Sequence, residues 1–138
     1  MSDSNEVRGY MGLDLSDKTA DSFLLDLAGE DQGRQKIRLT HKGLEQLLGK
    51  RDRLCVVIEA GTHSPWVSRA IESHGHECLV ANPRQLSFIF KSSKKNDAVD
   101  AEQLARVARL DRNLLCGGFL YRCLLRLCDG FGLLLLLQ

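Results

Sequence analysis

The sequence has almost no excess charge of either sign and no apolar run of membrane-spanning length. Its 138 residues include 19 lysines and arginines and 18 aspartates and glutamates, for a formal net charge of +1. A surface that is basic all over is therefore excluded, and binding to nucleic acid would need a local basic patch. The leucines from Leu133 to Leu137 form a run far shorter than the ~20 apolar residues of a membrane span. We therefore expect no membrane partner.

Closely spaced cysteine pairs and an apolar signal segment are also missing. The opening MSDSNEVRGY is acidic and polar, which disfavours a secretion signal. The cysteines are odd in number and contain no CxxC pair, so a disulfide framework is not indicated. We therefore expect a reduced, cytoplasmic protein. The five cysteines are Cys55, Cys78, Cys116, Cys123 and Cys128.

Motifs for zinc and for nucleotide phosphates are weak. His74, His76 and Cys78 alternate like zinc ligands, but no second pair of ligands completes a set of four. The glycines form neither a GxGxxG pattern nor a phosphate-binding loop. The segment GLDLSDKT is loosely similar to the phosphate-binding hairpin of actin-like kinases, but the chain is too short for the second hairpin that such a fold needs.

The residues that are present predict one globular domain. Hydrophobic residues make up 43% of the chain and charged residues 27%, which is typical of soluble globular proteins. We expect residues 1–9 to be disordered. Alternating apolar residues predict strands over 10–16, 19–27 and 35–40, with 28–33 as a polar connection. Short turns between them indicate an antiparallel meander.

After residue 40 the apolar pattern changes to helices alternating with strands. Thr40 is a candidate N-cap for a short helix over 44–48. Ser64 is a candidate N-cap for a second helix, with Pro65 at the first helical position and Gly75 at its end. Apolar runs predict strands over 54–61 and 77–82, and Asn96 is a candidate N-cap for a helix reaching Leu110. The order βββαβαβα predicts an α/β fold, a ribonuclease H-like mixed sheet with helices on its faces. The connector 83–95 stays unassigned, with SFIF (87–90) as a possible further strand.

Four acids occupy positions that strands and helices do not favour, or favour only in part. Asp14 interrupts the first strand, and Glu59 ends the most apolar one. Asp97 and Asp100 lie three residues apart on one face of the last predicted helix. Each acid has an ordinary alternative, a solvent-facing position or a helix start that favours negative charge. Together they would repel one another unless divalent cations lay between them, and Mg²⁺, or Mn²⁺ in its place, prefers oxygen ligands.

Basic residues gather just before this acidic helix. We predict that they contact nucleic-acid phosphates, although a solvated charged face is the alternative. Arg106 and Arg109 lie further along the helix, and His63, in GTHSP, either reaches the acids as a proton shuttle or simply leads into a helix. The predicted nucleic-acid-binding residues are Arg84, Lys91, Lys94 and Lys95.

Four motifs, GLDLS, VVIEAGTHSPWV, LVANPRQ and KKNDAVDAEQLA, resemble those of one protein family. It is the DEDD-type insertion-sequence transposases of family one hundred and ten, relatives of the Piv and MooV DNA invertases, also called bridge-RNA-guided serine recombinases. The resemblance covers Gly9 to Arg112, the RuvC-like N-terminal half. It implies that Asp14, Glu59, Asp97 and Asp100 bind metal, and that Mg²⁺-dependent DNA breakage and joining occurs in a multimer guided by an RNA.

The segment 113–138 departs from the family. Family members continue into a second domain with a catalytic serine, whereas LLCGGFLYRCLLRLCDGFGLLLLLQ contains no serine. We expect this tail to arise from a frameshift or truncation, with residues 10–112 as the RuvC-like domain. A chain without the serine domain would be incomplete as a recombinase. The alternative function is an inactive nucleic-acid-binding or dimerisation fragment with a ribonuclease H-like fold.

Overall fold

A computed structural model describes residues 6–84, 86 and 100–110 of the chain. Several predictions therefore lie outside the described residues. They concern the possible strand over 87–90, the cap Asn96, the acid Asp97, the lysines Lys91, Lys94 and Lys95, and the tail 113–138.

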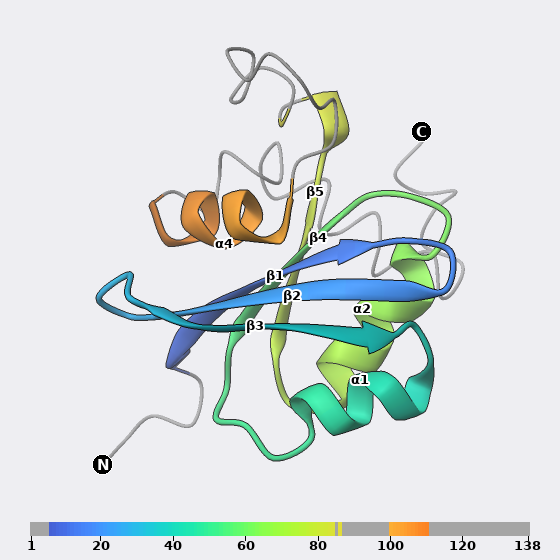
Figure 1. The fold of residues 1–138 in the computed structure, drawn as a ribbon, viewed down its shortest axis with the longest axis horizontal. Coiled ribbons are helices and arrows are strands. Elements are labelled where there is room, and N and C mark those ends of the chain that lie inside the picture. The colour runs from blue at the N-terminus through green and yellow to red at the C-terminus, as the bar shows by residue number, and fades with distance from the viewer. Residues whose placement is uncertain (1–5, 85, 87–99, 111–138) are drawn as a thin grey trace, which may run out of the picture.

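The elements follow the predicted order βββαβαβα (Figure 1). Most boundaries agree with the sequence to within a few residues. The strands and helices are β1 (Gly9–Leu15), β2 (Thr19–Asp26), β3 (Asp31–Arg38), α1 (His41–Leu48), β4 (Cys55–Glu59), α2 (Ser64–Ser73), β5 (Glu77–Ala81) and α4 (Ala101–Leu110).

The five strands form one mixed sheet in the order β3-β2-β1-β4-β5. β1 and β2 are antiparallel, as are β2 and β3, whereas β4 runs parallel to both β1 and β5. β1 and β4 are therefore neighbours at the centre of the sheet. An antiparallel meander continued by parallel strands and crossover helices is consistent with the ribonuclease H-like fold.

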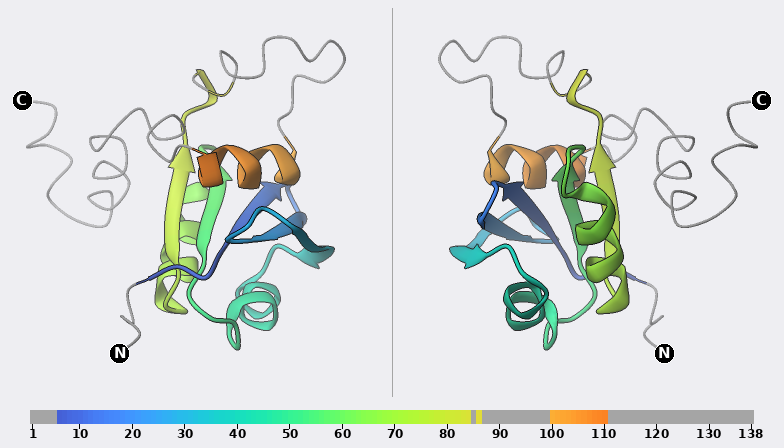
Figure 2. Two further views of the ribbon diagram at one scale, coloured as in Figure 1. Left: turned by 90° about the vertical axis from the view of Figure 1, so that its left-hand side faces the viewer. Right: turned by 90° about the vertical axis from the view of Figure 1, so that its right-hand side faces the viewer.

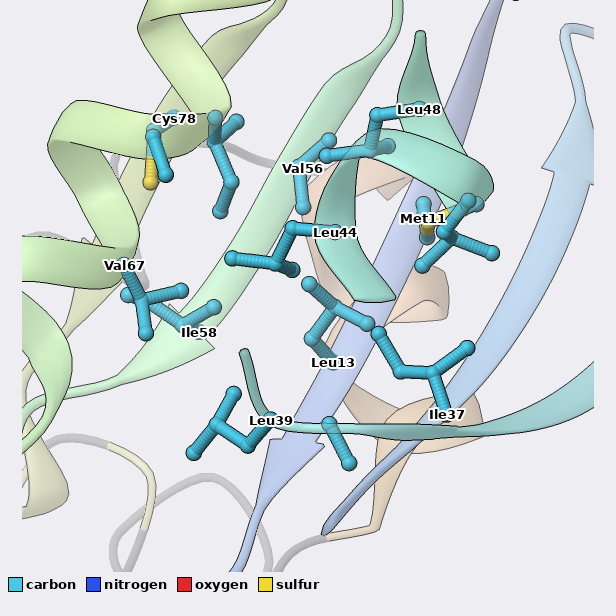
Figure 3. Close-up of a cluster of buried hydrophobic side chains, with 14 of the residues drawn as sticks. Met11, Leu13, Ile37, Leu39, Leu44, Leu48, Val56, Ile58, Val67 and Cys78 are labelled. Carbon is cyan, nitrogen blue, oxygen red and sulfur yellow. The ribbon is translucent and has the colours of Figure 1, made fainter. Parts of the chain in front are cut away.

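Helices cover both faces of the sheet, and successive strand residues alternate between them. Figures 1 and 2 show α4 on the opposite side of the sheet from α1 and α2. Leu13 and Ile58 point toward α1 and α2 and belong to the larger apolar cluster (Figure 3). Val57 points the other way and packs with Leu104 and Ala108 of α4. None of the helices within the described ranges is long and apolar enough to cross a membrane.

β3 begins at Asp31, inside the segment 28–33 that the sequence predicted to be a connection. The turn before it is tighter than predicted because Gly29, at φ +88°, donates its N–H to Asp26 O and lets the chain reverse. Gly33, at φ +124°, lies opposite an irregularity in β2 between Leu24 and Leu25. β3 is an edge strand with mostly exposed residues, so its polar sequence looked like a loop.

The helix caps agree with the sequence in two of three cases. Thr40 is the N-cap of α1 and accepts a hydrogen bond from Gly43 N at 3.0 Å. Gly75, at φ +86°, follows the C-terminus of α2 as predicted. Ser64 is instead the first residue of α2, and His63 occupies the N-cap position. The Ser64 hydroxyl bonds both backbone groups of Gly61 and so closes the preceding turn.

His76, one of the three alternating zinc candidates, holds the backbone together instead. Its Nδ1 accepts from Leu54 N at 3.0 Å, and its Nε2 donates to Leu48 O at 2.8 Å. Both ring nitrogens are therefore committed to the ends of α1 and β4. Burial lowers the pKa of His76, which favours the uncharged ring that these two bonds require. Zinc ligation by this histidine is not supported.

Candidate active site

Asp14 and Glu59 lie side by side at the carboxyl ends of β1 and β4. The last residue pair between these parallel strands is Leu13 with Ile58, and both of those side chains face α1 and α2. Asp14 and Glu59 follow them directly, so they emerge on the α4 side of the sheet. Both carboxylates are half-buried and line one cleft of about 240 Å³. The cleft is completed by Leu15, Ser16, Asp17, Ala60, Gly61, Thr62 and His63.

The cleft opposes ionisation of its two central acids. Burial raises the pKa of Asp14, and the nearby charges of Asp21 and Asp100 raise it further. Burial also raises the pKa of Glu59, and the charge of Asp14 adds to the effect. Carboxylates that repel one another in a partly dehydrated cleft are stabilised by a cation placed between them. A cation in the cleft would relieve the repulsion between these acids.

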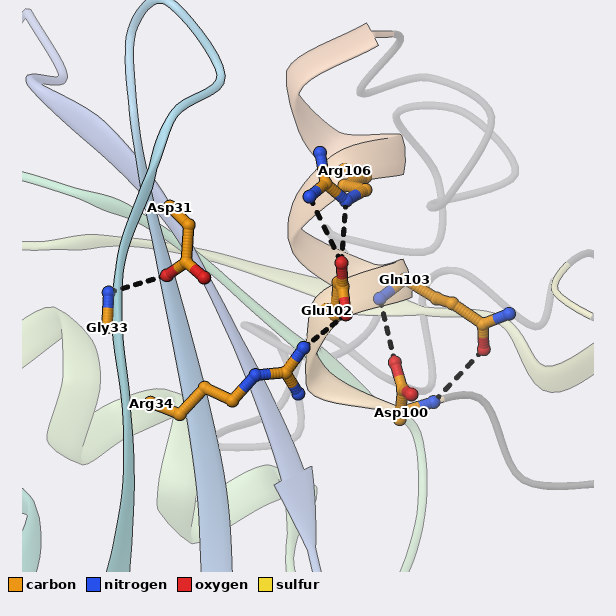
Figure 4. A network of polar contacts seen from close by, with 7 residues as sticks. All are labelled: Asp31, Gly33, Arg34, Asp100, Glu102, Gln103 and Arg106. Atoms are coloured by element: carbon orange, nitrogen blue, oxygen red, sulfur yellow. Dashed lines mark hydrogen bonds and ion pairs between the residues drawn. The ribbon is translucent and has the colours of Figure 1, made fainter.

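Asp100 is the N-cap of α4, which corrects the predicted position of this acid on the helix. Its Oδ1 accepts from Gln103 N at 2.9 Å, and Gln103 Oε1 accepts from Asp100 N at 3.2 Å (Figure 4). This reciprocal pair is a capping box, which stabilises the first turn of a helix. Helix α4 starts at Ala101, so Asp100 does not lie on a helical face as the three-residue spacing predicted. Its side chain caps α4, and its charge also raises the pKa of Asp14 in the cleft.

Glu102, just after this cap, ties α4 to the meander. Its carboxylate pairs with Arg34 of β3 and with Arg106 at 3.0 Å (Figure 4). The guanidinium groups of Arg34 and Arg106 also lie over the buried ring of Phe23, at 4.6 and 5.7 Å from its centre. Hydrogen bonds from Arg106 and Arg34 lower the pKa of Glu102. These contacts hold the start of α4, and hence Asp100, over β2 and β1.

The described basic residues differ in availability. Arg109 donates to Leu27 O at 3.3 Å and to Ala28 O at 2.9 Å, so it clamps the turn between β2 and β3. Arg106 pairs with Glu102 at 3.0 Å, so both arginines of α4 make contacts within the domain. Arg84 is exposed and lies three residues beyond the last residue of β5, at the same end of the sheet as Glu59.

The described acids do not form a complete metal site by themselves. Among residues 6–84, 86 and 100–110, no three His, Cys, Asp or Glu side chains form a group that could hold a metal ion. Asp14 and Glu59 share the cleft, and Asp100 is near enough for its charge to act on Asp14. Asp97, the fourth predicted ligand, lies outside the described residues.

The family of the chain follows from its sequence match over most of this fold. Residues 11–116 match the family described as Transposase, the DEDD transposases of the IS110 type. The chain belongs to this transposase family. A search of curated proteins gives no match. The family implies that the domain acts on DNA, with a general dependence on divalent metal ions.

Two residues of the transposase domain affect the site but were not predicted from the sequence. Asp21 of β2 pairs in register with Asp14 and raises its pKa. Its position two residues after Thr19 gave no sign of this, because the pairing depends on the register of the hairpin. Gly12 lies directly under the first turn of α4. The glycine before Leu13 and Asp14 in GLDLS was a usable sign, since a glycine inside a strand often marks a close backbone approach.

Two substitutions at Asp100 should distinguish its contribution as a helix cap from the effect of its negative charge. Asp100→Asn keeps a good N-cap, so the metal-free transposase domain should be about as stable as the wild type. Asp100→Ala removes the cap and should lower the free energy of unfolding by about 1 kcal/mol. Urea denaturation of the metal-free protein measures both. If asparagine destabilises the domain as much as alanine does, the cap is not what the aspartate contributes.

Proposed function

We propose that this domain breaks and joins DNA phosphodiester bonds in the cleft that Asp14 and Glu59 share. The supporting observation is the pair itself. Two half-buried carboxylates end adjacent parallel strands and face α4, and burial and the charges of nearby acids raise the pKa of each. Isolated acids at a protein surface need no such arrangement. A phosphoryl-transfer site that depends on divalent ions does.

The chemistry of these residues fits a divalent ion. The donors are carboxylate oxygens, which Mg²⁺ and Mn²⁺ prefer, and a bound cation would relieve the repulsion that raises both pKa values. In our proposal Asp14, Glu59, Asp97 and Asp100 are the metal-binding and catalytic residues. Bound ions would polarise the phosphate and assist the attacking oxygen. The capping box holds Asp100 at the start of α4, from where its charge acts on Asp14.

The remaining partners are also part of the proposal. Exposed Arg84, at the cleft end of the sheet, would contact DNA phosphates together with Lys91, Lys94 and Lys95. By the family resemblance, a guide RNA and a homo-oligomer complete the machinery of the full-length protein. The breakage and joining activity of the whole recombinase would also need the serine domain.

Mn²⁺ binding tests the proposal directly. Isothermal titration of the full chain should show Mn²⁺ binding that Asp14→Asn and Glu59→Gln each abolish, because each change removes a charged ligand from the cleft. Asp52→Asn is the matched control. Asp52 is an exposed acid near the start of β4, at the other end of the sheet, so its substitution should leave binding unchanged.

Wild-type protein that binds no Mn²⁺, or variants that bind it as well as the wild type does, would overturn the proposed metal site. An inactive fragment would then describe the function of this chain better than a DNA-cutting domain does. In that case the ribonuclease H-like fold would serve nucleic-acid binding or dimerisation without chemistry of its own. DNA binding that survives in EDTA would support this second function.

A further inference from the structure

His63 lines the acidic cleft, and its side chain plays no part in capping the helix that follows it. It shares the cleft with Asp14 and Glu59 and occupies the N-cap position of α2. Its side chain makes no capping hydrogen bond. Instead, Trp66 Nε1 donates a hydrogen bond to His63 Nδ1 at 3.2 Å. The imidazole is therefore oriented by a neighbour on the next turn rather than by the helix end.

The bond from Trp66 determines which nitrogen of the uncharged ring carries the proton. An indole N–H can only donate, so His63 Nδ1 must accept and Nε2 must hold the hydrogen. Among the residues that the structure describes, His63 Nε2 has no hydrogen-bond partner. The cleft is thus lined by a histidine with one N–H donor to spare.

Trp66 belongs to α2, and its ring packs against His41 of α1. It is partly buried against the larger apolar cluster, and its ring lies 4.9 Å from that of His41, tilted by 51°. The ring centres of His63 and Trp66 lie 6.3 Å apart, with the ring planes at 89° to one another. A tryptophan fixed by the packing of α1 and α2 can hold the imidazole in one orientation, as groups that bind reacting molecules require.

We propose that His63 donates a hydrogen bond from Nε2 to a non-bridging oxygen of the DNA phosphodiester in this cleft, with Trp66 as its positioning residue. This inference rests on the proposed function. Asp14, Asp17 and Glu59 bring carboxylate oxygens to the cleft, and a carboxylate oxygen can only accept hydrogen bonds. They offer nothing to phosphate oxygens except through a cation. His63 supplies a donor at the same place without adding a further acceptor.

DNA affinity and ring tautomer together test the inference. The probe is a short thymidine oligonucleotide with a fluorescent label, titrated with the full chain in Mg²⁺ and followed by anisotropy. His63→Ala should bind it about tenfold more weakly, the size of one hydrogen bond to a charged acceptor. Mn²⁺ affinity should stay unchanged. His74→Ala is the matched control, since His74 lies at the other end of α2 and does not line the cleft, and its oligonucleotide affinity should equal that of the wild type.

Nitrogen-15 NMR of the imidazole rings adds a readout that a purely structural role would not move. Wild-type His63 should show the proton on Nε2 when uncharged. Trp66→Phe removes the indole donor but keeps an aromatic ring, so the tautomers should mix and oligonucleotide affinity should fall part of the way toward that of His63→Ala. A proton on Nδ1 in the wild type overturns the inference, even if the alanine variant fails to fold.

The outcomes distinguish this inference from the proposed function. Wild-type protein that binds no Mn²⁺ ends the proposed function and the inference with it. Wild-type protein that binds Mn²⁺ while His63→Ala matches its oligonucleotide affinity overturns the inference alone. The same holds if the metal-loaded wild type does not bind the oligonucleotide, or if His63→Ala loses Mn²⁺ affinity.

Discussion

Replacing Gly12 with alanine should push α4 off the sheet and disrupt the acidic cleft. A Cβ atom on Gly12 would overlap the carbonyl oxygen of Ala101 and lie 2.8 Å from the Ala101 carbonyl carbon and 3.0 Å from Ala105 N. All three are backbone atoms of α4, so no side chain can turn aside to make room. Gly12 lies in the middle of β1, whose other neighbours are β2 and β4. The helix must therefore move, and Asp100 must move with it.

Two measurements should show this effect of Gly12→Ala. The free energy of unfolding, from urea denaturation, should fall by roughly 1–3 kcal/mol or more, as is usual when a close-packed contact is overfilled. Mn²⁺ affinity should also fall, because Asp100 is displaced from Asp14. Gly61→Ala is the matched control. Gly61 lines the same cleft, yet a Cβ there would meet no atom within 4 Å. Equal behaviour of the two variants would contradict a close approach of α4 at Gly12.

Asp14→Asn should stabilise the metal-free domain at neutral pH while abolishing metal binding. Folding raises the pKa of Asp14 and of Glu59 above their ordinary values of 3.8 and 4.5. The folded state therefore holds protons that the unfolded state releases. The stability that these protons contribute is complete below the ordinary pKa values and is lost as the pH rises through the raised ones. At neutral pH both groups oppose folding, and an uncharged asparagine removes part of that opposition.

Urea denaturation in EDTA over a range of pH measures the expected difference. Near pH 7, the free energy of unfolding of Asp14→Asn should exceed that of the wild type by up to about 1 kcal/mol. The difference is small because solvent screens a half-exposed group. The advantage should shrink as the pH falls toward 4. Glu102, with a lowered pKa, changes stability in the opposite direction, but it does so in both proteins. Asp52→Asn should show no such advantage at neutral pH. A neutral-pH loss of stability in Asp14→Asn would contradict the repulsion.

Adding saturating Mg²⁺ should reverse this order of stability. An ion that binds only the folded state stabilises that state. It can do so only while the protein keeps the side chains that bind it. The wild type should therefore gain stability from Mg²⁺, and Asp14→Asn should gain little. A variant that gains as much as the wild type would show that the ion binds elsewhere.

Local patterns in the sequence were enough to predict the order of the elements and the fold class. Apolar periodicity distinguishes strands from helices because each has its own repeat, and Thr40 and Gly75 mark helix ends by their own backbone chemistry. The apolar run over 54–61 predicted a strand, and β4 lies beside β1 at the centre of the sheet with four of its five residues buried. These features depend on residues near one another in the chain.

Only the tertiary structure decided how the parts of the site meet. Asp21 faces Asp14 because the hairpin has one particular register, and Gly12 is required because α4 crosses β1 at that residue. Asp100 became a helix cap because α4 starts one residue later, at Ala101. The start of β3 was predicted wrongly because this edge strand has few apolar residues. Its backbone pairing with β2 does not require an apolar face. Each of these depends on contacts between segments distant in sequence, and local periodicity carries no information about register or crossing point.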